Sequence, residues 1–422
     1  MKAKNRWAMM ARATSTWRAR LGGSPEVPSW TRMLLVPLAV ATMLELYLAY
    51  TTYGTDDITR WETFLSEAIR KGALGLYQSD PFFNHPPFMV SYIRGLGQVA
   101  AVTHVPFRFW LRAGSSMADI GSFALVVAIA RRSGLGVSRS TLYLLALAPV
   151  SVMVAGFHGN TDPVMVLFVL LAVYLHVSKR PVWTVGLALG MALNIKFAAV
   201  IFTPAIFFAT GGGRRRALLI VTAGLTVALA SMPYLLQDPA LIERKVVGYA
   251  SISDFWGITR VLVAGPRELH DAYLRYAPAV IAVGVAAVCF GFSRRRSPPS
   301  LFLQCGISGS AFLVFTPGFG VQYLAWLVPW VVILAFGSAL FWYAATGAFL
   351  FVVYTIGSGG FPWYHATDPR IGHWVNVAAI PAAIAWSATL MVLVAMLRRA
   401  TGRAPALAPT AETNLPLCSR AS

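Results

Sequence analysis

Charged residues are scarce in this sequence of 422 residues: only 12% are Asp, Glu, Lys or Arg, whereas 57% are hydrophobic. A chain with so few polar residues cannot cover the surface of a soluble globule of this size. The mean hydropathy of +0.63 agrees with this exclusion. The sequence therefore predicts an all-α polytopic membrane protein with no separate soluble domain.

Cysteine is almost absent as well, and the three cysteines exclude a disulfide framework, because Cys289 and Cys305 fall in apolar runs and Cys418 in the tail. Acidic residues number 16 against 35 Lys and Arg. The basic residues lie in short loops rather than on one foldable domain, which argues against a nucleic-acid partner. Walker loops, nucleophile elbows and metal-ligand spacings are missing. We expect no cofactor, and a divalent metal stays open but is not indicated.

Apolar runs of a length that spans a bilayer recur from residue 33 to residue 397. Short basic clusters separate them, and such clusters mark cytoplasmic loops. We therefore predict about twelve transmembrane helices within 33–397, a basic cytoplasmic segment at 1–32 and a disordered cytoplasmic tail at 398–422. The clusters used are Arg131-Arg132, Lys179-Arg180, Arg214 to Arg216, Arg294 to Arg296 and Arg398-Arg399.

The charge rule places a long loop, residues 51–108, on the outer side after the first span. Residues from Phe88 to Val105 are interpreted as an interfacial helix, because a second span there would carry Arg131 and Arg132 outside. Nearly every Asp and Glu then falls in an outer loop, although only Lys and Arg were used to assign the sides. This segregation points to chemistry on the outer face.

The stretch 181–210 is apolar, too long for one helix, and bracketed by two basic clusters. Two half-spanning helices that meet near Lys196 satisfy the charge rule and place that lysine in a polar cavity. A lone ammonium there suits a monoanionic lipid phosphate, and the alternative is a snorkelling lysine. Other candidates for the phosphate are Arg244, Lys245, Arg260 and Arg370.

Asp56 and Asp57 follow the first span directly. Either can serve as a helix N-cap, and either can act as a general base that takes a proton from an acceptor hydroxyl. A second polar turn runs from His158 to Pro163, where Asn160 can be turn or cap chemistry. Asp162 lies at the membrane boundary, where an acid is costly unless it is paired or faces water. The same cost predicts that Asp119, in the middle of a span, faces the bundle interior.

The order of these features resembles the GT-C superfamily of polyprenyl-phosphate-sugar-dependent glycosyltransferases. In particular, the turns are similar to those of the catalytic subunit of glycosylphosphatidylinositol mannosyltransferase I and of bacterial mannosyltransferases. The resemblance is carried by Asp56-Asp57, Gly72 or Gly75 with Tyr77, His85-Pro86-Pro87, His158 to Asp162, Tyr249 with Ser251 and Trp256-Gly257, and Gln322-Tyr323 with Trp326. The adjacent acids depart from the Asp-x-Asp spacing of eukaryotic members, and His158 replaces arginine. These departures leave open which Asp is the base and whether a metal takes part.

The resemblance implies a GT-C-like bundle that transfers a sugar, mannose first among the candidates, with inversion. The donor would be a polyprenyl phosphate and the acceptor a lipid or glycan on the outer face of a bacterial plasma membrane. Asp57 or Asp56 would be the base, and Lys196 and Arg260 would hold the donor phosphate. The sugar and acceptor pocket would include His85, His158, Asn160, Asp162, Tyr249, Gln322, Tyr323 and His365, with His365 as an outside candidate for the base.

Two rival functions fit the same composition. A transporter or flippase of a lipid-linked or anionic solute also uses broken helices and buried charges, but it distributes polar groups across the midplane and often shows internal repeats. Here the polar groups gather on one side, and no repeat is found. A noncatalytic scaffold in envelope assembly is the third reading. Sugar identity, acceptor and linkage are not specified by the sequence.

Overall fold

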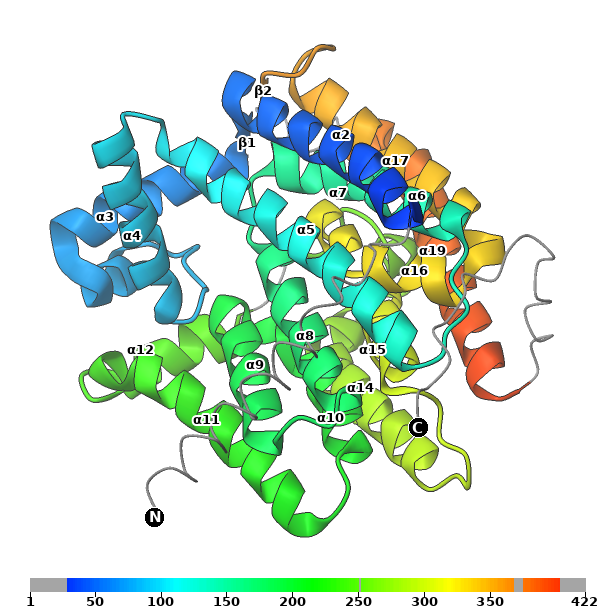
Figure 1. The fold of residues 1–422 in the computed structure, drawn as a ribbon. Helices are drawn as coiled ribbons and strands as arrows, with labels where there is room; N and C mark the ends of the chain where they lie inside the picture. Colours follow the sequence, from blue (N-terminus) through cyan, green and yellow to red (C-terminus); the bar gives the residue numbers. More distant parts are fainter. Residues whose placement is uncertain (1–28, 250–251, 368–374, 403–422) are drawn as a thin grey trace, which may run out of the picture.

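The computed structural model describes residues 29–249, 252–367 and 375–402, and the regular secondary structure of this part of the chain is helical apart from one pair of two-residue strands (Figure 1). In it, seven helices are long and apolar enough to cross a membrane, and four shorter apolar helices accompany them. The predicted polytopic membrane protein is thereby confirmed. The expected number of about twelve spans is not.

In the first part of the chain, the segment predicted to be an outer loop forms two helices at one side of the bundle (Figure 1). Its elements are α2 (Ser29–Thr51), β1 (Gly54–Thr55), α3 (Asp56–Ser79), α4 (Phe88–Thr103) and α5 (Phe107–Arg132). α3 presents Ile58, Trp61 and Ala68 as a buried stripe with helical spacing. α4 and α5 match the predicted division of residues 88–130, and α4 is not among the helices of spanning length.

The middle of the chain contains the predicted helix break. Its elements are α6 (Arg139–Ala146), α7 (Pro149–Ser151), the π-helix η1 (Val152–His158), α8 (Asp162–Val177), α9 (Val182–Ile195), the 3₁₀-helix η2 (Phe197–Phe202), α10 (Thr203–Ala209) and α11 (Gly213–Leu235). Lys196 has extended backbone angles, φ −152° and ψ 121°, between α9 and η2. The break at Lys196 is therefore confirmed.

The last part of the chain returns to the first outer loop. Its elements are α12 (Pro239–Ile242), η3 (Glu243–Val247), α13 (Ile258–Leu262), α14 (Arg267–Ser293), α15 (Leu301–Phe315), η4 (Val321–Trp326), α16 (Val328–Leu334), α17 (Phe336–Gly357), β2 (His365–Ala366) and α19 (Ala379–Ala400). β1 and β2 pair in parallel, with Gly54 opposite His365. This pairing joins two segments that are about 300 residues apart in sequence. Arg370 lies outside the described residues.

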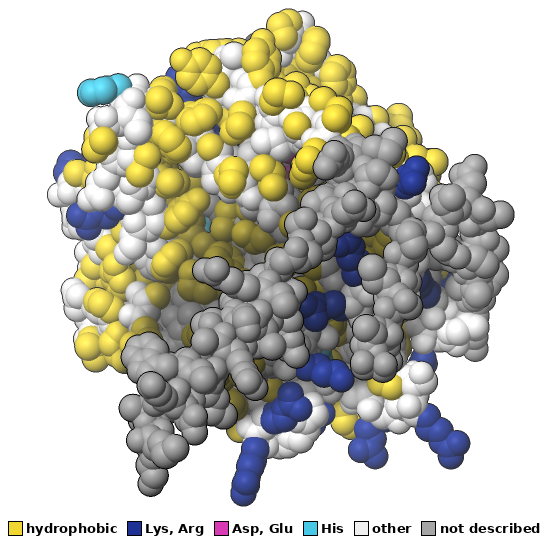
Figure 2. Space-filling model, viewed as in Figure 1, with side chains coloured by type: hydrophobic (Ala, Val, Ile, Leu, Met, Phe, Trp, Pro, Cys, Tyr) yellow, Lys and Arg dark blue, Asp and Glu magenta, His cyan; other side chains and the backbone are white. Residues whose placement is uncertain are grey.

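Basic side chains gather on one edge of the molecule. Figure 2 shows Lys and Arg side chains gathered along the lower edge, beneath a broad hydrophobic surface, with almost no Asp or Glu in view. In Figure 1 this edge holds the start of α11 and the end of α14. A broad exposed apolar surface bordered by basic side chains is what a bilayer and its cytoplasmic interface require.

One acidic pair lies inside the bundle. Asp119 of α5 and Glu45 of α2 line the same small cavity together with Ser151, and Glu45 is buried. The prediction that Asp119 faces the interior is confirmed. Its neighbour is a second acid, and among the described residues that line the cavity the polar side chains beside the pair carry hydroxyl groups.

Candidate active site

The site is built on the turn between η1 and α8. Gly159 forms this turn with φ +85°, a left-handed conformation that glycine adopts without cost. A Cβ atom at Gly159 would lie 2.2 Å from Cδ1 of Ile58. The absence of a side chain therefore lets the first turn of α3 pack directly on the turn, which brings the two polar motifs of the sequence together.

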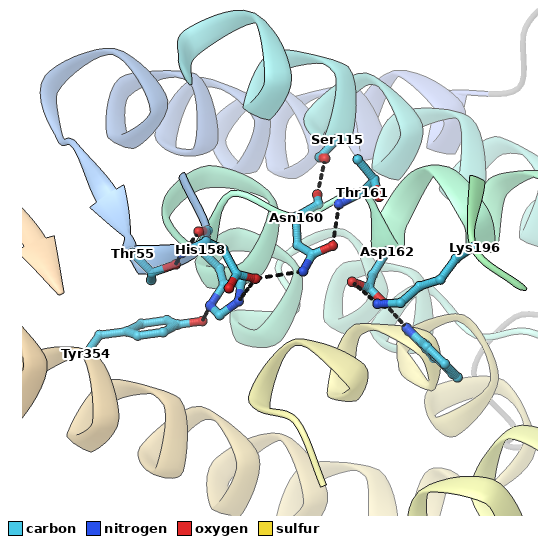
Figure 3. Close-up of polar contacts among 10 residues, drawn as sticks. Thr55, Ser115, His158, Asn160, Thr161, Asp162, Lys196 and Tyr354 are labelled. Atoms are coloured by element: carbon cyan, nitrogen blue, oxygen red, sulfur yellow. Dashed lines mark hydrogen bonds and ion pairs between the residues drawn. The ribbon is translucent and has the colours of Figure 1, made fainter. Parts of the chain in front are cut away.

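Asp57 lies at the N-terminus of α3, where its backbone N–H donates to the Thr55 hydroxyl. Its Oδ2 accepts hydrogen bonds from Asn160 Nδ2 at 2.8 Å and from His158 Nε2 at 3.2 Å (Figure 3). The side chain is 33% exposed. Among the described residues, none bonds Oδ1. One carboxylate oxygen is thus anchored, and the other has no hydrogen bond within the described part of the chain.

Three further hydrogen bonds hold the turn rigidly behind Asp57 (Figure 3). Thr55 donates to the carbonyl of His158 at 2.7 Å, and Ser115 of α5 donates to the carbonyl of Asn160 at 2.6 Å. The Asn160 side-chain oxygen accepts from the backbone N–H of Thr161 at 2.7 Å. That bond leaves the amide nitrogen of Asn160 directed at Asp57.

The surroundings keep Asp57 ionised. Burial by itself raises the pKa of Asp57, but the hydrogen bonds from His158 and Asn160 and the charge of Lys196 outweigh the effect of burial. The net result is a pKa below the ordinary value of an aspartate. A carboxylate that is ionised and partly exposed is able to accept a proton from a bound hydroxyl.

Lys196 faces the same region from the helix break. Its Nζ lies 2.8 Å and 3.0 Å from the two carboxylate oxygens of Asp162, which is fully buried at the start of α8. The indole N–H of Trp326 donates to the same carboxylate. The ammonium also lies 4.7 Å from the ring centre of Tyr323. The buried acid at the membrane boundary is therefore paired, as its position required.

His85, Tyr249 and Tyr323 lie close enough to these two clusters to interact with their charges. The His85 ring lies 4.5 Å from that of Trp61, and burial together with the charge of Lys196 lowers the pKa of His85 to about 3. Burial and the negative charge of Asp57 raise the pKa of Tyr249. Burial also raises the pKa of Tyr323, helped by Tyr249 and the nearby acids. His85 is consequently a neutral side chain at physiological pH.

The remaining predicted residues lie around this cluster or apart from it. Asp56 faces outward, with Oδ1 3.7 Å from Nε2 of His365, and both side chains are partly exposed. Gln322 is half-buried next to Tyr323 in η4. Arg260 is exposed and donates to the side-chain oxygen of Asn376 at 2.7 Å. Within the described part of the chain, no group of three or more His, Cys, Asp or Glu side chains is arranged to hold a metal ion.

Sequence reasoning missed two residues that shape the site. Arg112 of α5 is fully buried and donates to the carbonyls of Ala49 at 2.7 Å and Thr52 at 2.8 Å, which fixes the end of α2 above the site. An arginine within a largely apolar helix was a usable signal. Tyr354 of α17 bonds Nδ1 of His158 at 3.0 Å. Nothing in the sequence singles out this tyrosine among the apolar residues of its helix.

The fold and the site together define a helical membrane protein with an ionised acid at an acid/base cluster near one end of its bundle. The chain matches the family model of glycosyltransferase family 87 over residues 83–317, more than half of its length. The protein therefore belongs to glycosyltransferase family 87, a family of GT-C type, and is a membrane glycosyltransferase. A comparison with curated proteins gives no match.

Proposed function

We propose that this membrane glycosyltransferase transfers a sugar, mannose in the first instance, from a polyprenyl-phosphate donor to a lipid or glycan acceptor. The reaction takes place on the extracytoplasmic face of a bacterial plasma membrane, with Asp57 as the general base. The observation that carries the proposal is the state of Asp57, whose Oδ2 is anchored by Asn160 and His158 while Oδ1 has no hydrogen bond from a described residue.

The chemistry needs one base and no acid. Asp57 takes the proton of the acceptor hydroxyl at Oδ1 while the hydroxyl oxygen attacks the anomeric carbon of the donor sugar. The bond between that carbon and the phosphate oxygen breaks, and the polyprenyl phosphate leaves with the electron pair. A phosphate leaves without protonation, so a single displacement with inversion suffices and the second carboxylate of glycosidases is not needed.

Lys196 is the proposed anchor of the donor phosphate. Two N–H groups of the Lys196 ammonium donate to the oxygens of Asp162. The remaining N–H is available to an anion in the partly accessible region near Tyr323. The Asp162 carboxylate holds the ammonium in place but also offsets its charge. A second cation is therefore needed near the phosphate, and Arg260 is retained for that role, since Asn376 is a neutral partner that a phosphate can replace.

The sugar and the acceptor are proposed to occupy the space around Asp57. The donors and acceptors nearest to it come from three separate elements, which suits recognition of several hydroxyl groups on a sugar ring. The proposed lining residues are His85, His158, Asn160, Asp162, Tyr249, Gln322 and Tyr323, with His365 on the outer side next to Asp56.

The proposal is tested with membranes that contain wild-type protein or Asp57→Asn, incubated with polyprenyl-phosphate mannose labelled in the sugar. Wild type should move label into a lipid or glycan product, and Asp57→Asn at equal abundance should not. Polyprenyl-phosphate glucose and a nucleotide-linked mannose serve as donor controls. Transfer from the nucleotide sugar alone would contradict the donor class, and undiminished transfer by Asp57→Asn would contradict the base.

A further inference from the structure

We propose that Tyr354 is a positioning residue that fixes the neutral tautomer of His158 with the proton on Nε2. In this tautomer His158 donates a hydrogen bond to Asp57 and leaves the base free to take a proton at Oδ1. The inference rests on the proposed role of Asp57, and it adds a residue from α17, a helix remote in sequence from the acids.

The direction of each hydrogen bond follows from the chemistry of its partners. An ionised carboxylate only accepts hydrogen bonds, so the 3.2 Å contact between Asp57 Oδ2 and His158 Nε2 requires the proton on Nε2. In a neutral imidazole the other nitrogen, Nδ1, is then an acceptor. The Tyr354 hydroxyl, 3.0 Å from Nδ1, is the donor that it needs. The three groups form one chain of bonds that runs from Tyr354 to Asp57 (Figure 3).

The opposite tautomer is disfavoured by the same contacts. With the proton on Nδ1, the lone pair of Nε2 would face the Asp57 carboxylate at 3.2 Å, and two acceptors would be opposed without a proton between them. The carbonyl of His158 is held by Thr55 at 2.7 Å, which restrains the backbone that carries the ring. A rotation of the His158 ring away from Asp57 would leave a buried N–H group of the ring without an acceptor.

Tyr354 is itself held in place by packing. Its side chain is 1% exposed, and its ring lies 5.0 Å from that of Phe157 and 5.4 Å from that of Trp363. His158 is 6% exposed. A water molecule is therefore not a ready replacement for the tyrosine hydroxyl, and loss of that hydroxyl leaves Nδ1 without its donor.

The expected effect on Asp57 has a definite sign. The bond from His158 is one of the interactions that hold the pKa of Asp57 below its ordinary value. When the histidine is no longer fixed, that pKa rises, and Asp57 is protonated at a higher pH. The other titratable groups around Asp57 are His85, Lys196, Tyr249 and Tyr323, and a variant at Tyr354 leaves all four in place.

The first test compares Tyr354→Phe with wild type in the transfer reaction across pH. We expect kcat to fall by about tenfold with the KM for the donor within about twofold, and the acidic limb of the profile to move to higher pH. Tyr343→Phe is the matched control, because Tyr343 lies on the same helix, is buried, and among the described residues donates only to the carbonyl of Val328, at 3.5 Å. The control should leave the limb unchanged.

The second test separates positioning from a general loss of packing. Gln at position 158 carries an amide donor and cannot change tautomer, so His158→Gln should keep part of the activity. In that background Tyr354→Phe should add less than about a twofold loss. Two results would overturn the role of Tyr354. One is a full tenfold loss of activity when Tyr354→Phe is added to His158→Gln. The other is a pH profile of Tyr354→Phe that superimposes on that of an active wild type.

A readout that needs no transfer keeps this inference distinct from the proposed function. In protein labelled with ¹⁵N-histidine, the His158 signals among the seven histidines are identified by their loss in His158→Gln. We expect a bare Nδ1 and a protonated Nε2 in wild type, and a changed pattern in Tyr354→Phe. A protonated Nδ1 in the wild type overturns the inference, whatever the transfer assay gives.

Discussion

Lys196 and Asp162 form an ion pair inside the helix bundle, with Nζ 2.8 Å and 3.0 Å from the two carboxylate oxygens. The aspartate has no exposure and the lysine side chain is 15% exposed. One partner starts α8 and the other occupies the break after α9, so the pair joins two half-buried helix ends. The same lysine is the proposed phosphate anchor, which gives it both a structural and a functional role.

The two roles of Lys196 are separable. Lys196→Met leaves Asp162 charged and unpaired, and we expect a loss of about 3–5 kcal/mol in stability. Lys196→Met combined with Asp162→Asn removes both charges and should regain most of the melting temperature in detergent. Transfer should stay absent in both variants, because the phosphate has lost its cation. Recovery of transfer in the neutral double variant would show that Lys196 does not bind the donor.

Two features of Gly159 should prevent its replacement: its left-handed backbone conformation and its close contact with Ile58. A comparison of Gly159→Ala with Gly134→Ala separates the two. In Gly159→Ala, the alanine must adopt a strained left-handed backbone conformation, and its Cβ is forced against Ile58. We expect the free energy of unfolding to fall by about 3 kcal/mol or more. Gly134 has φ +64° and no described atom within 4 Å of its Cβ position. Gly134→Ala should therefore cost only about 1 kcal/mol.

The melting temperatures of the two glycine variants in detergent test this difference. Ile58→Ala should partly rescue Gly159→Ala by clearing the contact, and it should do nothing for Gly134→Ala. Equal losses at the two positions would mean that α3 does not pack on the turn as described.

His85 makes stability depend on pH. Its pKa of about 3 in the folded protein is below the ordinary value of 6.5, so between these values the unfolded chain binds a proton that the folded chain does not. Stability must fall as the pH is lowered through this window. His85→Asn removes the group, and we expect its melting temperature to decline less than that of wild type from about pH 7 to about pH 4. If the melting temperatures of wild type and His85→Asn declined in parallel, His85 would be exposed to solvent rather than buried.

The sequence allowed the class of helical membrane protein and part of the site to be predicted, but not the number of spans. The break at Lys196 followed from two basic clusters around one apolar stretch, and the turn from His158 to Asp162 followed from polar residues between spans. Both signals are local. The sequence indicates that Asp162 is an acid that needs a partner. Its pairing with Lys196 depends on how α8 and α9 pack, and the sequence of neither segment shows this packing.

The rest of the site depends on contacts between distant segments. Tyr354 contributes because α17 passes the end of η1, and an apolar helix that contains a tyrosine gives no sign of this. The choice between Asp56 and Asp57 was also open in the sequence. Only the turn geometry at Gly159 directs His158 and Asn160 at Asp57, while Asp56 faces His365 on the outer side.

The central claim is that Asp57, and not its neighbour, removes the proton from the acceptor. The most direct test is the turnover number of purified Asp57→Asn and Asp56→Asn with a labelled polyprenyl-phosphate sugar, at matched melting temperature. We predict a loss of about 10²–10⁴ in kcat for Asp57→Asn and less than about tenfold for Asp56→Asn. Comparable losses in the two variants, or the larger loss in Asp56→Asn, would contradict the account.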